Sequence, residues 1–231
     1  MNKKINNKKA VVIFGPPGSG KGTQANLVAG KLNIFHLDTG KFLEQLLNDP
    51  ANKNNKEIQK EKKLFDTGML LIPRFVLKFI VKKINEVAKL GSGIVFSGSP
   101  RTYFEAFGDK KNVGVVETLE KIYRKNNVKY MLLDASSDQS MQRNSNRLLC
   151  SSCGTQLLSV LKVKYEKCPF CGGKLRTRTL DKPEVIKIRL VEYAQRTEPI
   201  IKELEKRGYK INKIKADKLP YEVFNMLIKK I

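Results

Sequence analysis

The residues best suited to chemistry form a glycine-rich stretch that reads GPPGSGKGT from Gly15 to Thr23 and directly follows the apolar residues 10–14. A short β-branched run of this kind predicts a buried parallel strand. Glycines after such a strand let backbone N–H groups converge on an anion, and the next helix offers its positive N-terminal end. Lys21 adds a charge for the β- and γ-phosphates, and the Thr23 hydroxyl is placed to reach Mg²⁺. The stretch predicts a nucleoside triphosphate site rather than a Gly/Pro turn with an incidental lysine.

All four cysteines stand in two Cys-x-x-Cys pairs, Cys150 with Cys153 and Cys168 with Cys171. Tetrahedral Zn²⁺ binds four thiolates, and each such turn points two sulfurs at one centre. The alternatives are a disulfide, which a cytosolic chain disfavours, and a redox motif, for which no thioredoxin-like context is present. The spacing predicts a structural zinc site without an open coordination position and therefore without a catalytic role.

Arginines outside the glycine-rich stretch recur at positions that suit phosphoryl transfer, a reaction that needs cations around the moving group and exclusion of water. Arg101 follows the end of a predicted strand, where α/β sheets bind ligands. Arg143 and Arg147 are spaced i,i+4 on one predicted helix just before the cysteines, and Arg178 and Arg189 follow them. Together these arginines are candidate phosphate ligands.

Strand and helix patterns alternate along most of the chain. We predict strands at residues 10–14, 33–36, 93–98, 128–134 and 209–214, and helices at 23–32, 41–47, 73–90, 113–125, 138–147, 183–207 and 221–230. This alternation predicts an α/β fold with a doubly wound parallel sheet covered on both faces. Asp181 is expected to cap the long helix that begins at Pro183. Two segments interrupt the alternation, a polar helical one near residues 39–72 and the cysteine-bearing one near 148–177.

The chain has 231 residues, and Lys and Arg exceed Asp and Glu by 23. This excess suits either a nucleic-acid surface or a lysine-rich solvated surface. The lysines are dispersed and no aromatic-interleaved stacking platform is visible, so a nucleic-acid partner is left open by charge but is not favoured. No apolar run approaches the roughly 18–20 residues of a membrane helix, and residues 1–9 do not form a signal peptide. A cytoplasmic protein without a membrane partner is expected.

Over nearly its whole length the chain resembles the adenylate kinase family, in the form whose lid carries a structural zinc. The resemblance rests on GPPGSGKGTQ from Gly15, HLDTG from His36, GSPRT from Gly98, Arg143 and Arg147 before the cysteines, Arg178, Asp181 and Glu184 after them, RLVEY from Arg189, and TEP from Thr197. It implies a P-loop core at residues 1–38, 73–147 and 178–231, a helical monophosphate-binding lobe at 39–72, and a zinc-knuckle lid at 148–177. It also implies that a monomer transfers the γ-phosphoryl group of Mg-ATP to AMP, giving two ADP.

The resemblance also implies residue roles. The implied ATP ligands are Gly18, Ser19, Gly20, Lys21, Gly22, Thr23, Arg143 (near the adenine) and Arg147. The implied AMP ligands are Thr39, Gly98, Arg101, Glu105, Arg178 and Arg189. The implied catalytic cations are Lys21, Arg101, Arg147, Arg178 and Arg189, with Mg²⁺ accompanying ATP and structural Zn²⁺ on the four cysteines.

Four substitutions, and one extra residue before Pro73, depart from the family pattern. Glu44 stands where the family has an arginine on the AMP phosphate, and Leu180 replaces the first of two lid aspartates. Ser97 replaces an aspartate that orders the magnesium waters. Glu105 replaces a glutamine that reads the adenine edge, and an ionised carboxylate only accepts hydrogen bonds. The alternatives are therefore another acceptor, GMP or CMP, and an RNA-associated P-loop and zinc-knuckle protein with weak kinase activity.

Overall fold

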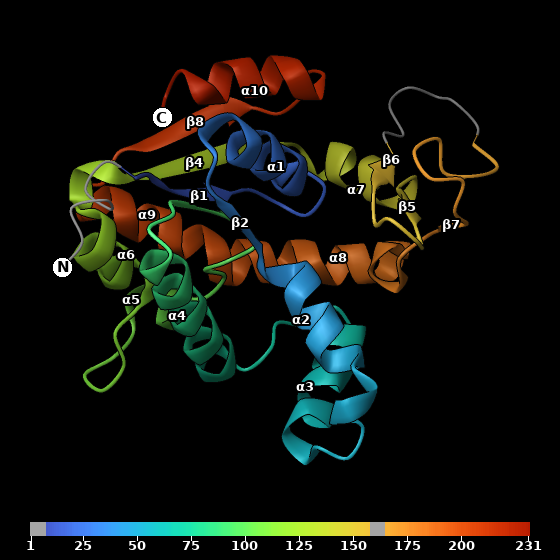
Figure 1. Cartoon of the computed structure of the whole chain (residues 1–231), viewed down its shortest axis with the longest axis horizontal. Helices are drawn as coiled ribbons and strands as arrows, with labels where there is room; N and C mark the ends of the chain where they lie inside the picture. The colour runs from blue at the N-terminus through green and yellow to red at the C-terminus, as the bar shows by residue number, and fades with distance from the viewer. Residues whose placement is uncertain (1–7, 158–164) are drawn as a thin grey trace.

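A computed structural model of the chain describes residues 8–157 and 165–231, so residues 1–7 of the predicted core and 158–164 of the predicted lid lie outside the described residues. Five parallel strands form the central sheet in the order β2-β3-β1-β4-β8 (Figure 1). In chain order they are β1 (Ala10–Phe14), β2 (Phe35–Asp38), β3 (Ile94–Ser97), β4 (Val128–Asp134) and β8 (Ile211–Lys215).

Helices lie on both faces of this sheet (Figure 1). They are α1 (Lys21–Leu32), α2 (Thr39–Asn48), α3 (Lys56–Asp66), α4 (Pro73–Lys89), α5 (Tyr103–Phe107), α6 (Val115–Tyr123), α7 (Ser137–Ser145), α8 (Pro183–Glu192), α9 (Glu198–Lys206) and α10 (Pro220–Ile228). The predicted α/β fold with a doubly wound parallel sheet is confirmed. No helix among the described residues has both the length and the apolar character needed to cross a membrane.

The sheet separates two apolar clusters, and β1 contributes to both. Side chains of a strand alternate between faces, so Val12 and Phe14 join the cluster under α4, α6 and α9, whereas Val11 and Ile13 join the cluster under α1 and α10. Every residue of β1 is buried. This strand is therefore held from both sides, and the glycine-rich loop that follows it starts from a rigid base.

The described residues of the two inserted segments add no strand to the central sheet. Helix α2 directly follows β2, and α2 and α3 project together away from the sheet (Figure 1). The Phe42 ring of α2 stacks on Phe79 of α4 with centroids 4.0 Å apart. The cysteine-bearing segment forms an antiparallel sheet in the order β6-β5-β7, made of β5 (Leu148–Cys150), β6 (Gln156–Leu157) and β7 (Leu175–Arg176), here called the lid sheet.

Three sequence-based expectations need correction. The predicted helix at 183–207 is interrupted by a π-helical turn at Tyr193–Thr197, where the Thr197 hydroxyl donates to the Arg101 carbonyl oxygen at 2.9 Å. Asp181 does not cap α8: the N-cap residue is Lys182, without a side-chain capping bond, because the Asp181 carboxylate binds Arg147 instead. Arg147 lies beyond the end of α7 and therefore does not share that helix with Arg143.

Candidate active site

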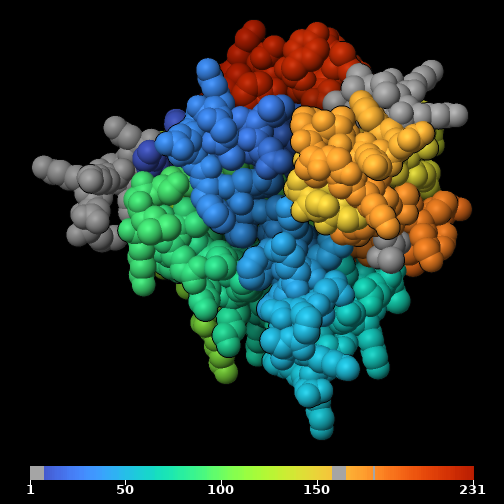
Figure 2. All heavy atoms as spheres, turned by 45° about the vertical axis from the view of Figure 1, so that its right-hand side comes forward, coloured from blue at the N-terminus to red at the C-terminus, as the bar shows by residue number. Residues whose placement is uncertain are grey.

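A cavity of about 560 Å³ opens beyond the carboxyl ends of the central strands, the usual place for ligands in this architecture. Figure 2 shows the lid-sheet segment, in yellow and orange, beside the blue surface of the first helices. Most of the predicted nucleotide ligands line this cavity: Gly18, Ser19, Gly20, Lys21, Gly22, Thr23, Gly98, Arg101, Arg143, Arg147, Arg178 and Arg189. Thr39 and Glu105 line a smaller adjoining recess, which shares Gly98 and Arg101 with the cavity.

The glycine-rich loop leads into α1 without a side-chain cap, because its N-cap residue is Gly20 in the left-handed conformation. The first N–H groups of α1 have no partner within the helix, so they are donors for an anion. The Lys21 ammonium folds back and donates to the carbonyl oxygens of Gly15 and Pro16, both at 2.7 Å. Burial, and then the charges of Arg101, Arg189 and Arg147, hold its pKa well below the usual lysine value.

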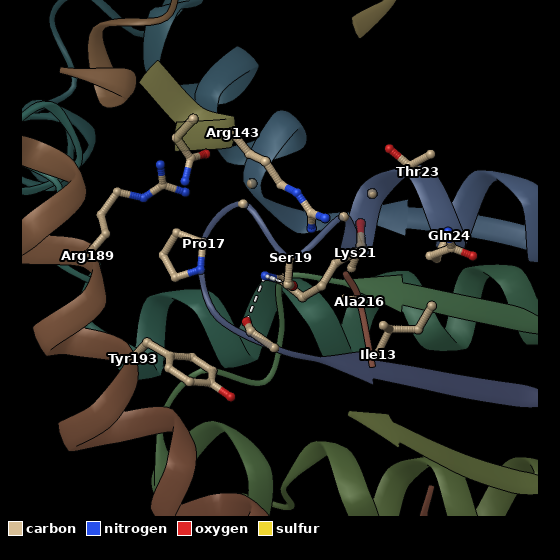
Figure 3. A pocket seen from close by; sticks show the side chains of 18 of the residues that line it. Ile13, Pro17, Ser19, Lys21, Thr23, Gln24, Arg143, Arg189, Tyr193 and Ala216 are labelled. Atoms are coloured by element: carbon tan, nitrogen blue, oxygen red, sulfur yellow. Dashed lines mark hydrogen bonds between the residues drawn. The ribbon is translucent and has the colours of Figure 1, made fainter. Parts of the chain in front are cut away.

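Asp181 organises two of the arginines beside this loop. Its carboxylate accepts from Arg147 Nε at 2.8 Å and pairs with the same guanidinium through a second nitrogen, and Arg189 Nη1 lies 3.8 Å from Asp181 Oδ1. Arg189 Nη1 also donates to the Leu180 carbonyl oxygen at 3.2 Å. In the view of Figure 3, Arg189 and Arg143 approach the loop from opposite sides of Pro17.

The cavity carries more positive charge than its own carboxylates neutralise. Burial and the neighbouring arginines lower the pKa of Arg189 to about 9, and burial lowers that of Arg101. Cations this close repel one another, and the repulsion falls when an anion binds between them. The arrangement is therefore suited to a polyphosphate.

Arg178 has a partner that the sequence did not reveal. Its guanidinium forms an ion pair with the Glu44 carboxylate of α2 at 2.5 Å, while its Nε is buried without a hydrogen-bond partner among the described residues. In the same region, a Cβ added to Gly154 beside the lid sheet would lie 3.2 Å from Lys41 Nζ of α2. The start of α2 and the cysteine-bearing segment therefore lie in contact, with Glu44 directed at a guanidinium.

Two polar side chains of the recess, Thr39 and Glu105, are buried. The Thr39 hydroxyl is buried without a partner among the described groups. The Glu105 carboxylate accepts from the Arg101 backbone N–H at 2.8 Å and from the Thr102 hydroxyl at 3.0 Å. Burial nevertheless raises the pKa of Glu105 to about 7.

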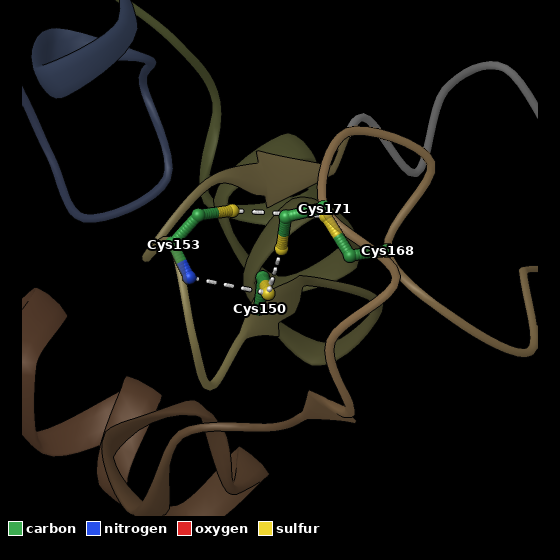
Figure 4. Close-up of side chains that lie close together, drawn as sticks. All are labelled: Cys150, Cys153, Cys168 and Cys171. Carbon is green, nitrogen blue, oxygen red and sulfur yellow. Dashed lines mark hydrogen bonds between the residues drawn. The ribbon is translucent and has the colours of Figure 1, made fainter.

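The four cysteine sulfurs lie within 4.8 Å of one another at the edge of the lid sheet (Figure 4). Cys150 Sγ is 3.4 Å from Cys171 Sγ, and Cys153 Sγ is 3.7 Å from Cys168 Sγ. A tetrahedral Zn²⁺ with bonds of about 2.3 Å separates its sulfurs by about 3.8 Å. Gly154 and Gly172, each directly after the second cysteine of its pair, have φ of +69° and +70°, the conformation expected of glycine there. The four thiols fit one zinc ion.

Other cavity residues carried no predicted role. Asp38 ends β2, Tyr193 begins the π-helical turn, and residues 216–220 follow β8. Gln24 of α1 binds this last loop by donating from Nε2 to the Pro220 carbonyl oxygen at 2.9 Å. The sequence signal that could have identified Asp38 and residues 216–220 is their position at the carboxyl ends of strands β2 and β8. Tyr193 could not be identified in this way, because its place in the cavity depends on the π-helical turn.

Comparisons with known proteins agree with this geometry. The family model described as adenylate kinase matches residues 13–209. The chain is 31% identical over 224 residues to the adenylate kinase of Petrotoga mobilis, covering 94% of this chain and 96% of that protein. It is 36% identical over 205 residues to the adenylate kinase of Methanothrix thermoacetophila, covering 86% and 87%. With its parallel sheet, glycine-rich loop and converging arginines, the chain belongs to the adenylate kinase family.

Proposed function

We propose that the chain transfers the γ-phosphoryl group of Mg-ATP to AMP and releases two ADP. The observation that carries this proposal is the convergence of Lys21, Arg101, Arg147, Arg178 and Arg189 on one cavity at the carboxyl ends of the sheet. The adenylate kinase relatives support the same reaction and do not favour another acceptor or an RNA-associated role.

In the proposed reaction the donor phosphates lie on the first turn of α1. Backbone N–H groups of residues 18–23 bind phosphate oxygens, and Lys21 leaves its loop carbonyls for the β- and γ-phosphates. Arg143 packs near the adenine. The Thr23 and Ser97 hydroxyls and the Asp38 carboxylate line the cavity wall and would hold Mg²⁺, which prefers oxygen ligands. When bound, this ion would neutralise negative charge that develops on the phosphates. Arg147 and Arg189, oriented by Asp181, contact the moving group.

The acceptor would occupy the recess and the adjoining part of the cavity. Thr39, with its unpartnered hydroxyl, Gly98 and Arg101 would hold AMP, and Arg178 and Arg189 would reach its phosphate. We propose residues 39–72 as the lobe that binds AMP and 148–177 as the lid over ATP, closing on a core of 1–38, 73–147 and 178–231. Closure would exclude water, which otherwise competes as the acceptor.

Glu105 suits adenine better than an ionised carboxylate would. With its pKa raised to about 7, a large share of this group carries a proton at neutral pH. A protonated carboxyl both donates and accepts, as the amide of glutamine does. We therefore keep AMP as the acceptor.

We further propose that Cys150, Cys153, Cys168 and Cys171 bind one structural Zn²⁺, supported by the sulfur geometry. Reduced thiols in such pairs suit a cytoplasmic protein. The adenylate kinase assignment accounts for the site without a further chain, so a monomer is proposed.

The Lys21→Ala variant should lose at least about a hundredfold in kcat, because the lost charge acts mainly on the transition state. Its thermal midpoint should stay close to that of the parent, because two effects oppose each other. The variant loses two hydrogen bonds to loop carbonyls, and it also loses a buried charge that neighbouring arginines repel. A coupled assay of ADP formation measures the first effect. Lys31→Ala, at the exposed end of the same helix, is the matched control, and near-parent turnover of Lys21→Ala would refute the assigned role.

Purified protein should contain one Zn²⁺ per chain by elemental analysis. Cys153→Ser should lose the metal and lower the thermal midpoint, because metal binding and folding of this segment share one free energy. Part of the activity should remain at low temperature, since no cysteine is placed on substrate. Ser151→Ala, in the same turn, should keep both metal and midpoint, whereas a stable, metal-free parent protein would contradict the zinc assignment.

The Glu44→Gln variant should lower KM for AMP about three- to tenfold, the range expected when an ion pair worth about 1 kcal/mol no longer competes for Arg178. The change in kcat should be smaller. Initial rates at saturating ATP measure both constants. Glu57→Gln makes the same charge change on the exposed surface of α3 and should leave KM unchanged; an increased KM in Glu44→Gln would show that the pair favours AMP binding.

The Glu105→Gln variant should differ from the parent in a pH-dependent way. The folded-state pKa of Glu105 is raised to about 7, so the parent holds this proton more tightly when folded, and its stability falls as pH rises from about 4.5 through 7. The variant lacks this dependence, so its free energy of unfolding relative to the parent should rise across that window by up to about 3 kcal/mol.

The same titration should appear in AMP binding. The ratio of parent to variant KM for AMP should increase severalfold between pH 6 and pH 8.5, because the parent loses its donor and the variant does not. Taking the ratio at each pH cancels the titration of AMP itself. A constant ratio would mean that Glu105 only caps the start of α5.

A further inference from the structure

The carboxylate of Asp38, on edge strand β2, lies close to the first turn of the helix that follows the glycine-rich loop. It is the last residue of β2 and the register partner of Ser97, the last residue of β3, and both line the cavity. A Cβ added to Gly22 would lie 4.0 Å from Asp38 Oδ2. The carboxylate therefore faces the first turn of α1, one residue from Thr23.

One oxygen of this carboxylate is available for a ligand. Asp38 Oδ1 accepts from the Lys41 backbone N–H at 3.1 Å and so caps α2. No hydrogen bond or ion pair within the described parts of the chain reaches Oδ2. An acid that serves only as a helix cap needs one oxygen, so the second remains free beside the phosphate-binding loop.

Ser97 is oriented by a short chain of hydrogen bonds. His36 Nε2 lies 2.6 Å from Ser97 Oγ, and His36 Nδ1 lies 2.6 Å from Asn26 Oδ1 of α1. Because an amide oxygen accepts, we assign the proton to Nδ1, and Nε2 then accepts from the Ser97 hydroxyl. Burial lowers the pKa of His36 and favours its neutral form. The lone pairs of Ser97 Oγ are left to accept from water.

We propose that Asp38 is the carboxylate that positions the water ligands of the magnesium ion carried by ATP, assisted by Ser97 and completed by the Thr23 hydroxyl. This inference rests on the proposed function and concerns the same site. Mg²⁺ prefers oxygen ligands and keeps several waters, which carboxylates orient through hydrogen bonds. Adjacent strands lie about 4.8 Å apart, a distance that one bridging water can span, so a carboxylate on β2 can serve an ion near the end of β3.

Asp38 is an acid in a cavity that is rich in cations. The negative charge of Asp38 raises the pKa values of Lys21 and Arg101, although burial and neighbouring cations dominate the shift of Lys21. A role limited to neutralising these cations would act on ATP with or without metal. A role in positioning the magnesium waters acts only on the metal-bound nucleotide.

The test replaces Asp38 by Asn, which caps a helix as well as Asp does. The substitution removes the charge and turns one acceptor oxygen into an NH₂ donor. The probe is Mn²⁺ added to the protein with β,γ-methylene-ATP, with free Mn²⁺ followed by electron paramagnetic resonance. Asp38→Asn should weaken Mn²⁺ binding to this complex about tenfold, the size of effect known for groups that orient the ligands of a metal through hydrogen bonds. Binding of the metal-free nucleotide, measured by calorimetry in EDTA, should stay within twofold of the parent or become tighter.

The matched control is Asp49→Asn, which changes an aspartate that caps the short 3₁₀ turn Pro50–Asn52 and lies outside the cavity. It should leave both affinities unchanged. The proposal is overturned if Asp38→Asn leaves Mn²⁺ affinity within twofold of the parent, or weakens metal-free and metal-bound nucleotide equally. Failure of the parent protein to bind the nucleotide would instead refute the proposed function.

Discussion

Mutual repulsion among buried cations is the constraint on which the rest of the site depends. Lys21, Arg101 and Arg189 each have a lowered pKa because they are buried and lie near other positive groups. Without a bound anion this cluster opposes folding, so the surrounding structure has to supply the stabilising free energy. The buried strand β1 and the two apolar clusters that it joins supply that support. The repulsion that they hold in place favours polyphosphate binding.

Buried carboxylates determine which cations stay fixed and which remain free to move. Asp181 has an almost fully buried side chain and holds the Arg147 guanidinium through two nitrogens, so this arginine is oriented before any ligand arrives. The Lys21 ammonium donates to the Gly15 and Pro16 carbonyl oxygens at 2.7 Å and to Ser19 Oγ at 3.5 Å, and it can leave them for phosphate oxygens. Arginines that are oriented in advance, beside a lysine that can move, suit the transfer of a negatively charged phosphoryl group between two nucleotides.

Local patterns allowed the sequence to predict the fold class, the glycine-rich loop and the four thiols that now lie together. Each depends on residues near one another in the chain. The role of Asp181 was predicted wrongly because proximity to Pro183 suggested a cap, whereas its partner Arg147 is remote in sequence and reaches it only through the fold. The π-helical turn at Tyr193–Thr197 was missed for the same reason, since the contact between Thr197 and Arg101 joins distant segments.

The residues that depart from the family pattern have surroundings in the structure that change what each residue type would do alone. Glu44, considered alone, would repel an AMP phosphate, yet it faces Arg178 and reduces the excess of positive charge in the cavity. Glu105, considered alone, would be an ionised acceptor, yet burial raises its pKa to about 7 and so allows it to donate as well. Ser97 lacks a carboxylate but lies beside Asp38 in the register of the sheet. The effect of a changed residue type therefore depends on its burial and on the charges around it, because the electrostatic field at a phosphate depends on the sum of nearby charges rather than on the residue that supplies each one.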